Sequence, residues 1–265
     1  MTHMNDNQKN EMTYNANHIF HYTNLNAAIK IILSNSLKFG EFANMNDIAE
    51  SYRDLLDNID SQTLRRILSE YRSISLTEDT SNSERGFAID CLWGYYAEKG
   101  QGVCLVFDKE KLLVRYEQQY ACKGVPEDKS IKYIEDYQNL VIAKGNTEEE
   151  IRSYVDNHIF EIFYEKDSCW SYEKEIRLLT KSKDNDERCY LPFEDSLIAA
   201  IICVQSNDYK ESEQYKLLSK LKDTYGFGIY NYSIKLGKRT LQMGDKTVWP
   251  ISGVEEEIDL GKDND

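Results

Sequence analysis

"CWSYEKEIRLLT", residues 169–180, places two glutamates and an arginine on a segment with the apolar spacing of a half-buried strand. Side chains alternate between the faces of a strand, so Glu173, Glu175 and Arg177 are expected on one face, with the two acids about 7 Å apart. In a cleft, each carboxylate would raise the pKa of the other, and Arg177 would lower both. The alternative is an exposed ladder of alternating charge, and the spacing alone favours that alternative.

The spacing of apolar residues before and after this stretch predicts both helices and strands. Apolar residues at helical spacing predict helices, and short apolar or alternating runs predict strands. Helices are expected over residues 24–36, 44–59, 61–71, 85–100, 147–164 and 209–222, with a short one near 109. Strands are expected over residues 18–23, 37–42, 72–79, 101–107, 117–125, 129–135, 171–181, 188–193, 197–205, 228–236 and 240–243.

The absence of an internal repeat or composition break favours one α+β domain over residues 17–250. A flexible N-terminal tail (1–16) and an acidic C-terminal tail (251–265) are expected to flank it. Thr147 and Glu150 have the spacing of a capping box, which predicts the start of the helix over 147–164.

The composition is that of a globular chain with an acidic surface. The 265 residues include 41% hydrophobic ones, enough for a core, and the net charge is −14. That charge repels a phosphate backbone and disfavours broad, non-specific binding of nucleic acid. No apolar run is long enough to span a bilayer, and the start lacks a signal-peptide pattern. A cytoplasmic protein without membrane association is expected.

Several sequence motifs that indicate a metal-binding or nucleotide-binding site are missing. The six cysteines form no CxxC pair and the four histidines lack zinc-ligand spacing, so free thiols and no metal are expected. The chain has neither a glycine-rich phosphate loop nor a GxSxG or HExxH motif. A P-loop ATPase, a Rossmann dehydrogenase and a zinc hydrolase are therefore disfavoured.

A histidine and an aromatic cluster are the next candidates. His21 and Thr23 share a strand face just before a predicted helix, whose first N–H groups suit an anion or a carboxamide. The commoner explanation of a lone histidine is a half-buried side chain at a strand end. Trp93 and Tyr96, in "CLWGYYA", have helical spacing and are either core residues or a stacking surface for a flat heterocycle.

A polar set in "NDIAE" is the last candidate. Asn46, Asp47 and Glu50 offer two carboxylates and an amide close together. The alternative is a helix cap followed by ordinary surface acids.

The order of these motifs resembles domain-of-unknown-function family 2971, a bacterial family. The motifs are "HYTNLNAAIKIILSNSLKFGEFANMNDIAE", "SISLTED", "CLWGYYAEKGQGVCLVFD" and "WSYEKEIRLL". The resemblance covers roughly residues 18–205. The chain departs from the family pattern at Leu92, where methionine is common, and after Asp47, where proline is frequent.

A more distant likeness is to the ADP-ribosyltransferases, and it implies their mixed and antiparallel sheets with inserted helices. It also implies that His21, with the adjoining Tyr22 and Thr23, holds the nicotinamide ribose and carboxamide. Tyr22 stands where that superfamily usually has glycine. Trp93 and Tyr96 would sandwich the nicotinamide ring.

The same likeness assigns roles to the acidic strand and to the serine strand. It implies that Glu175 stabilises the oxocarbenium-like ribose as nicotinamide leaves, while Glu173 positions the acceptor. Arg177 would keep both acids ionised or bind phosphate, and Ser75 would contact the nucleotide. NAD is then a substrate, no cofactor is permanently bound, and ADP-ribose passes to an unknown acceptor macromolecule. A role as a phage-defence or toxin effector is expected.

Two other functions stay open. One is a non-catalytic module that binds a nucleotide-like ligand or a protein. The other is a metal-dependent nuclease or phosphodiesterase that uses the "NDIAE" acids. Convergence of His21, Tyr96 and Glu175 on one cleft would support the transferase, and two solvent-exposed glutamates would support the binding module.

Overall fold

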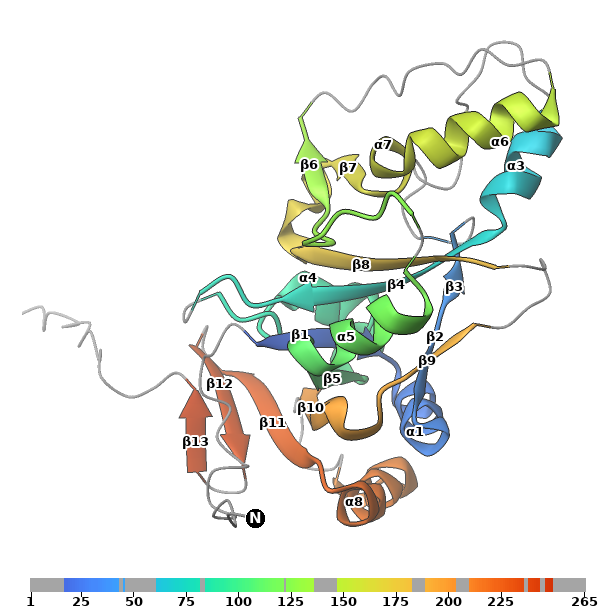
Figure 1. Cartoon of the computed structure of the whole chain (residues 1–265). Coiled ribbons are helices and arrows are strands. Elements are labelled where there is room, and N and C mark those ends of the chain that lie inside the picture. The colour runs from blue at the N-terminus through green and yellow to red at the C-terminus, as the bar shows by residue number, and fades with distance from the viewer. Residues whose placement is uncertain are drawn as a thin grey trace, which may run out of the picture.

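The computed structural model describes residues 17–42, 45, 61–81, 84–121, 123–135, 147–182, 189–203, 210–235, 238–243 and 246–249. These residues form a nine-stranded mixed sheet, two small two-stranded sheets and helices packed against them (Figure 1). Most neighbouring strands of the large sheet are antiparallel, and the pair β10–β11 is parallel. The predicted α+β class is confirmed, and the two expected tails lie outside the described residues.

The large sheet is built on a central group of buried strands. Its order is β13 (Lys246–Trp249), β12 (Lys238–Met243), β11 (Gly228–Lys235), β10 (Leu197–Cys203), β5 (Val103–Asp108), β1 (His18–Thr23), β4 (Tyr71–Glu78) and β3 (Gly40–Glu41). The ninth strand, β8 (Glu175–Lys181), pairs with β4 along nearly its whole length. The small sheets pair β2 (Ser36–Lys38) with β9 (Tyr190–Pro192), and β6 (Lys132–Ile134) with β7 (Glu165–Asp167).

The helices cover both faces of the large sheet and its β8 edge. The described helices are α1 (Leu25–Ser34), α3 (Ser61–Leu68), α4 (Asp90–Tyr95), α5 (Lys109–Gln119), α6 (Glu148–Asn157), α7 (Ile159–Phe163) and α8 (Glu213–Tyr225). Three short 3-10 helices are η3 (Glu98–Gly100), η4 (Ser168–Glu173) and η5 (Glu194–Ser196). None of the described helices has the length and apolar content needed to cross a bilayer.

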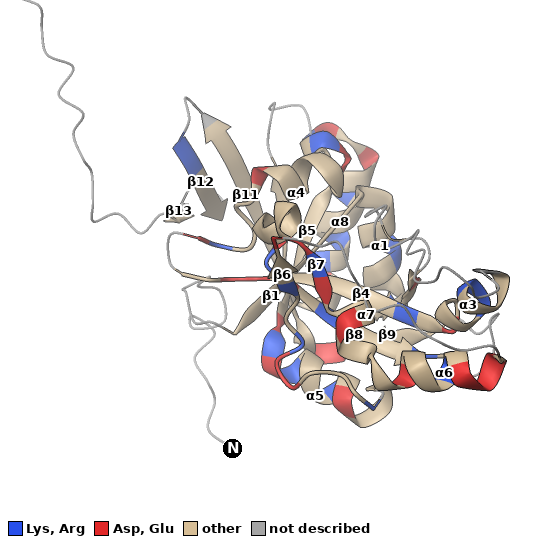
Figure 2. Cartoon of the chain, turned by 90° about the horizontal axis from the view of Figure 1, so that it is seen from above, with Lys and Arg blue, Asp and Glu red and all other residues tan. Residues whose placement is uncertain are grey.

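Successive side chains of β1 point to opposite faces of the sheet and pack into two separate layers of the core. Ile19 packs into the cluster that includes α1, α5 and α8, whereas Phe20 and Tyr22 pack into the cluster around Trp93 and α4. A third cluster joins α3, α6 and α7 to the β8 edge, where these helices lie together in Figure 1. Acidic and basic residues both occur along α5 and α6 (Figure 2).

The strongest local patterns are confirmed. β1 spans the predicted residues 18–23, and the Asn24 side chain caps α1 by accepting from the Ala27 N–H. The capping box of Thr147 and Glu150 starts α6 as predicted.

Other elements differ from the predictions in their boundaries. The strand expected over 117–125 is wrong, because α5 continues to Gln119. The helix expected over 147–164 is broken at His158. Its ring nitrogen Nδ1 lies 2.8 Å from the Tyr154 carbonyl oxygen, the acceptor that its backbone N–H would use in a continuous helix, and that N–H instead donates to the Val155 carbonyl oxygen. The helix expected over 85–100 is shorter, with α4 ending at Tyr95 and η3 following it.

Candidate functional site

The site lies at a split in the large sheet. β1 pairs with β4 only through Ile19 and Phe20 and then continues along β5, while β3 pairs with the opposite end of β4. Between these two pairings, residues 74–76 of β4 have no partner on that edge among the described strands. A pocket of about 260 Å³ occupies the split, and both His21 and Glu175 line it. The convergence predicted for the histidine strand and the acidic strand is confirmed.

Glu175 is an ionised carboxylate at the pocket wall. It begins β8 and is only 4% exposed. Arg177 donates to it from Nε at 2.8 Å and from Nη2 at 3.0 Å, and the Ser75 hydroxyl donates at 2.6 Å. Desolvation raises the pKa of Glu175, but Arg177, Lys166 and the Ser75 hydroxyl outweigh it and lower the pKa to about 2.

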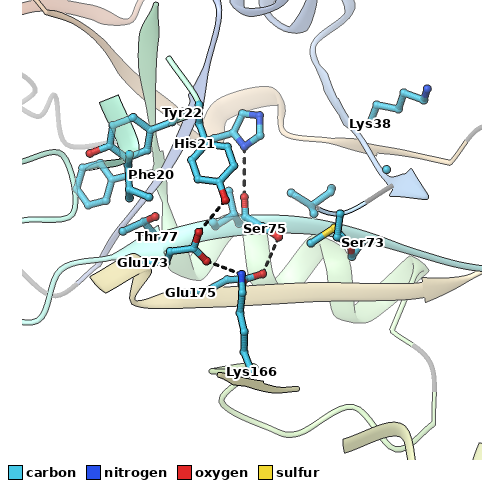
Figure 3. A pocket seen from close by; sticks show the side chains of 16 residues that line it. Phe20, His21, Tyr22, Lys38, Ser73, Ser75, Thr77, Lys166, Glu173 and Glu175 are labelled. Atoms are coloured by element: carbon cyan, nitrogen blue, oxygen red, sulfur yellow. Dashed lines mark hydrogen bonds and ion pairs between the residues drawn. The ribbon is translucent and has the colours of Figure 1, made fainter. Parts of the chain in front are cut away.

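Glu173 lies beside Glu175 but not on the strand. It ends η4, and Lys174 follows with a left-handed backbone (φ 49°), so the expectation that Glu173 shares the strand face is wrong. The Tyr96 hydroxyl donates to Glu173 Oε1 at 2.7 Å, and Lys166 Nζ lies 2.7 Å from Oε2 (Figure 3). Desolvation raises the pKa of Glu173; Lys166 opposes this, and the Glu175 charge adds to it.

Both glutamates are buried, which contradicts the exposed charge ladder that the spacing alone favoured. Glu173 is 5% exposed, and Arg177 is fully buried. The two carboxylates meet at Lys166, whose Nζ is also 3.5 Å from Glu175 Oε2. The buried cluster therefore combines two acids with two bases, and one acid has a low pKa while the other has a raised pKa.

His21 faces the acidic pair across β4. Its Nδ1 lies 3.4 Å from the Ser75 carbonyl oxygen, one of the acceptors that the split leaves without a strand partner (Figure 3). Burial lowers the pKa of His21, which favours the neutral imidazole. Tyr22 also lines the pocket, but its hydroxyl donates into the core, to the Gly86 carbonyl oxygen at 2.6 Å. Thr23 ends β1 and is not among the residues that line the pocket.

Two predicted ligand contacts lie elsewhere. Trp93 is 3% exposed, stacks on Tyr232 with ring centres 5.6 Å apart and donates from Nε1 to the Phe87 carbonyl oxygen. It is a core residue that does not line the pocket, unlike Tyr96 three residues later. Arg177 is fully buried behind Glu175 and donates to the Phe163 carbonyl oxygen at 2.6 Å. Of its two expected roles, the geometry fits support of the Glu175 charge and not a phosphate contact.

The "NDIAE" residues Asn46, Asp47 and Glu50 lie outside the described residues. Among the described residues, no three His, Cys, Asp or Glu side chains gather closely enough to hold a metal ion.

Sequence reasoning missed four polar pocket residues. Ser73 and Thr77 flank Ser75 on the same face of β4, and the alternation in "SISLT" was a usable signal for them. Lys38 comes from β2, at the outer edge of the pocket in Figure 3. Lys166 comes from β7, a three-residue strand without recognisable periodicity.

A comparison with known protein families gives a match over part of the chain. No curated protein matches the chain. The family model described as "Protein of unknown function (DUF2971)" matches residues 92–178, which include Tyr96, Lys166, Glu173 and Glu175. The family predicted from the order of the motifs is confirmed over this segment.

Proposed function

We propose that the pocket binds the nicotinamide end of NAD and that the chain transfers ADP-ribose to an acceptor. The observation that carries this proposal is the ionised carboxylate of Glu175 at the wall of a pocket lined mainly by buried residues, with His21 and Tyr96 lining the same pocket. A fixed carboxylate in a site of low dielectric stabilises positive charge that develops in a transition state, without reorganisation of solvent. Cleavage of the nicotinamide–ribose bond develops such a charge on the ribose.

The chemistry divides between the two acids. When the N-glycosidic bond breaks, its electron pair stays on the nicotinamide nitrogen, and the ribose becomes an oxocarbenium-like cation beside Glu175. The acceptor then attacks the same ribose carbon and gives up a proton. Glu173, with a raised pKa, is suited to take that proton, because a general base works best when its pKa is near the working pH. The neutral imidazole of His21 would contact the ribose without adding a competing positive charge.

One observation favours a second candidate, a binding module without catalysis. The formal charges of Glu173, Glu175, Lys166 and Arg177 cancel, so the buried cluster as a whole is neutral. A neutral cluster can orient a polar or zwitterionic ligand through hydrogen bonds and exert little net field on a developing cation.

A single assay distinguishes the two candidates. The purified chain is incubated with NAD labelled in its adenylate half, with and without a bacterial cell lysate, and label is followed in protein, nucleic acid and free ADP-ribose. The transferase predicts label transfer, or NAD hydrolysis without lysate, that is lost in the Glu175→Gln variant. If calorimetry detects binding of NAD and no cleavage occurs, the result supports the binding module. If the chain neither binds nor cleaves NAD, NAD is rejected as the ligand.

A further inference from the structure

Lys166 is a buried lysine of the pocket that has no role in the proposed chemistry so far. It is 3% exposed, although lysine is rarely buried without a partner. Its ammonium lies 2.7 Å from Glu173, 3.5 Å from Glu175 and 4.7 Å from the ring centre of Trp170. Figure 3 shows it rising from β7 to a point between the two acids. A buried ammonium this close to a carboxylate favours the ionised form of that carboxylate.

The two acids depend on Lys166 to different extents. Glu175 has a bidentate partner in Arg177 and a hydroxyl donor in Ser75, so its charge has support without Lys166. Glu173 has one neutral donor, the Tyr96 hydroxyl, and one cation, Lys166. Among the described residues, no other cation lies within salt-bridge distance of Glu173. Loss of Lys166 would leave Glu173 desolvated and next to a fixed negative charge.

The remaining titratable groups around Glu173 do not replace that cation. Tyr133 on β6 and Tyr172 on η4 have pKa values that burial raises, so both are neutral phenols at pH 7. His21 on β1 has a pKa that burial lowers and is neutral as well. The guanidinium of Arg177 is engaged by Glu175. Lys38, at the outer edge of the pocket, lies away from both acids in Figure 3.

We propose that Lys166 is a positioning residue that keeps Glu173 ionised at neutral pH and aimed into the pocket, so that Glu173 can accept the proton of the attacking acceptor. The expected effect on transfer rests on the proposed transferase function. The ionisation of Glu173 by Lys166 does not. Lys166 itself touches neither the ribose nor the acceptor in this mechanism. Its removal should therefore affect the transfer step more than the cleavage step.

The direct test measures the charge of Glu173 without any substrate. The chain is labelled with glutamate carrying ¹³C at the side-chain carboxyl, and the Glu173→Gln variant identifies the Glu173 signal. In the parent chain Glu173 should be ionised at pH 7, and in Lys166→Met its titration should move to higher pH. Lys166→Arg, which keeps the charge, should stay close to the parent. Lys132→Met removes an exposed lysine from the neighbouring strand β6 and should not move the signal.

The kinetic test uses the same variants with labelled NAD. At pH 7, the rate of ADP-ribose transfer in Lys166→Met should fall by a factor at least about ten times larger than the rate of NAD hydrolysis does. That difference is within the range that a general base contributes. Raising the pH should restore part of the transfer, whereas a merely structural role would leave the pH profile unchanged. If Lys166→Met does not fold, Lys166→Gln keeps a hydrogen-bond donor without the charge and replaces it.

The outcomes for Lys166 and for the transferase can be told apart. A protonated Glu173 in the parent at pH 7 would overturn the proposal, and so would an unchanged Glu173 titration in both neutral variants. Absence of any NAD turnover in the parent would reject the transferase alone, because the carboxyl titration still decides what Lys166 does.

Discussion

Replacing Glu175 by glutamine is expected to lower the free energy of unfolding by about 3 kcal/mol at pH 7. The contacts with Arg177, Lys166 and Ser75 lower the pKa of Glu175 from 4.5 to about 2, and one pKa unit corresponds to about 1.4 kcal/mol. An independent argument gives a similar size. Glutamine would leave the fully buried guanidinium of Arg177 without its counter-charge, and breaking a buried ion pair in this way costs about 3–5 kcal/mol.

The sign of the pH dependence follows from the direction of the pKa. Because the folded-state pKa of Glu175 lies below its ordinary value, its stabilisation is fully present above about pH 5 and is lost as the pH falls towards about 2. The parent should therefore lose stability across that window, while Glu175→Gln lacks this contribution at every pH. The difference between the two proteins should narrow as the pH falls from 5.

Thermal and urea unfolding followed by circular dichroism at pH 7, 5, 4 and 3 test this expectation. A loss of 3 kcal/mol corresponds to a fall in Tm of roughly 6–12 °C for a chain of this size. Glu194→Gln is the matched control, because Glu194 forms a 2.6 Å ion pair with Arg115 but is 59% exposed, and its loss should cost less than about 1 kcal/mol. Equal stabilities of parent and Glu175→Gln at pH 7 would refute the view that the buried cluster depends on an ionised Glu175.

Three further expectations concern activity, packing and thiols. Glu175→Gln should lower NAD cleavage by about two to three powers of ten, whereas Glu173→Gln should reduce transfer more than hydrolysis, both measured on purified variants below their Tm. Tyr96→Phe removes the hydroxyl that donates to Glu173 and should also reduce transfer more than hydrolysis. Gly102→Ala should destabilise the chain by about 1–3 kcal/mol, because a Cβ there would lie 2.3 Å from the Thr23 carbonyl oxygen. Gly94→Ala, with no atom within 4 Å of the added Cβ, should be neutral or stabilising in the same melts. A thiol reagent should titrate six cysteines after unfolding, since no disulfide joins the five described ones; a smaller number would indicate a bridge or another modification.

The elements that could be predicted from the sequence are those whose signals are local. β1 and the start of α6 follow from a short apolar run and from the capping box of Thr147 and Glu150, and neither depends on distant contacts. Serine alternation in β4 is local too. The convergence of His21 and Glu175 could be predicted only through the order of the motifs, because the pairing of their strands with β4 spans long sequence separations.

The parts that could not be predicted depend on single backbone angles or on tertiary contacts. The left-handed Lys174 moves Glu173 off the strand, and no periodicity reports such an angle. Trp93 and Tyr96 have the same aromatic character in sequence, yet Tyr232 on a C-terminal strand covers Trp93, while Tyr96 reaches Glu173. The burial of both acids follows from the layer of β6, β7 and η4 above β8, which alternation within one strand cannot indicate.

The split between β1 and β3 gives the site a physical reason to exist. A continuous sheet would satisfy the β4 backbone at residues 74–76 with strand hydrogen bonds, whereas here the Ser75 carbonyl oxygen faces His21 and the Ser75 hydroxyl donates to Glu175. Buried polar groups of this kind cost free energy unless they are paired, so Arg177 and Lys166 are as necessary to the fold as to the pocket. Stability and the proposed chemistry thus depend on one set of side chains. A variant of this cluster reports on function only when it is assayed below its own Tm, and a variant that keeps its Tm but loses transfer would separate the two roles.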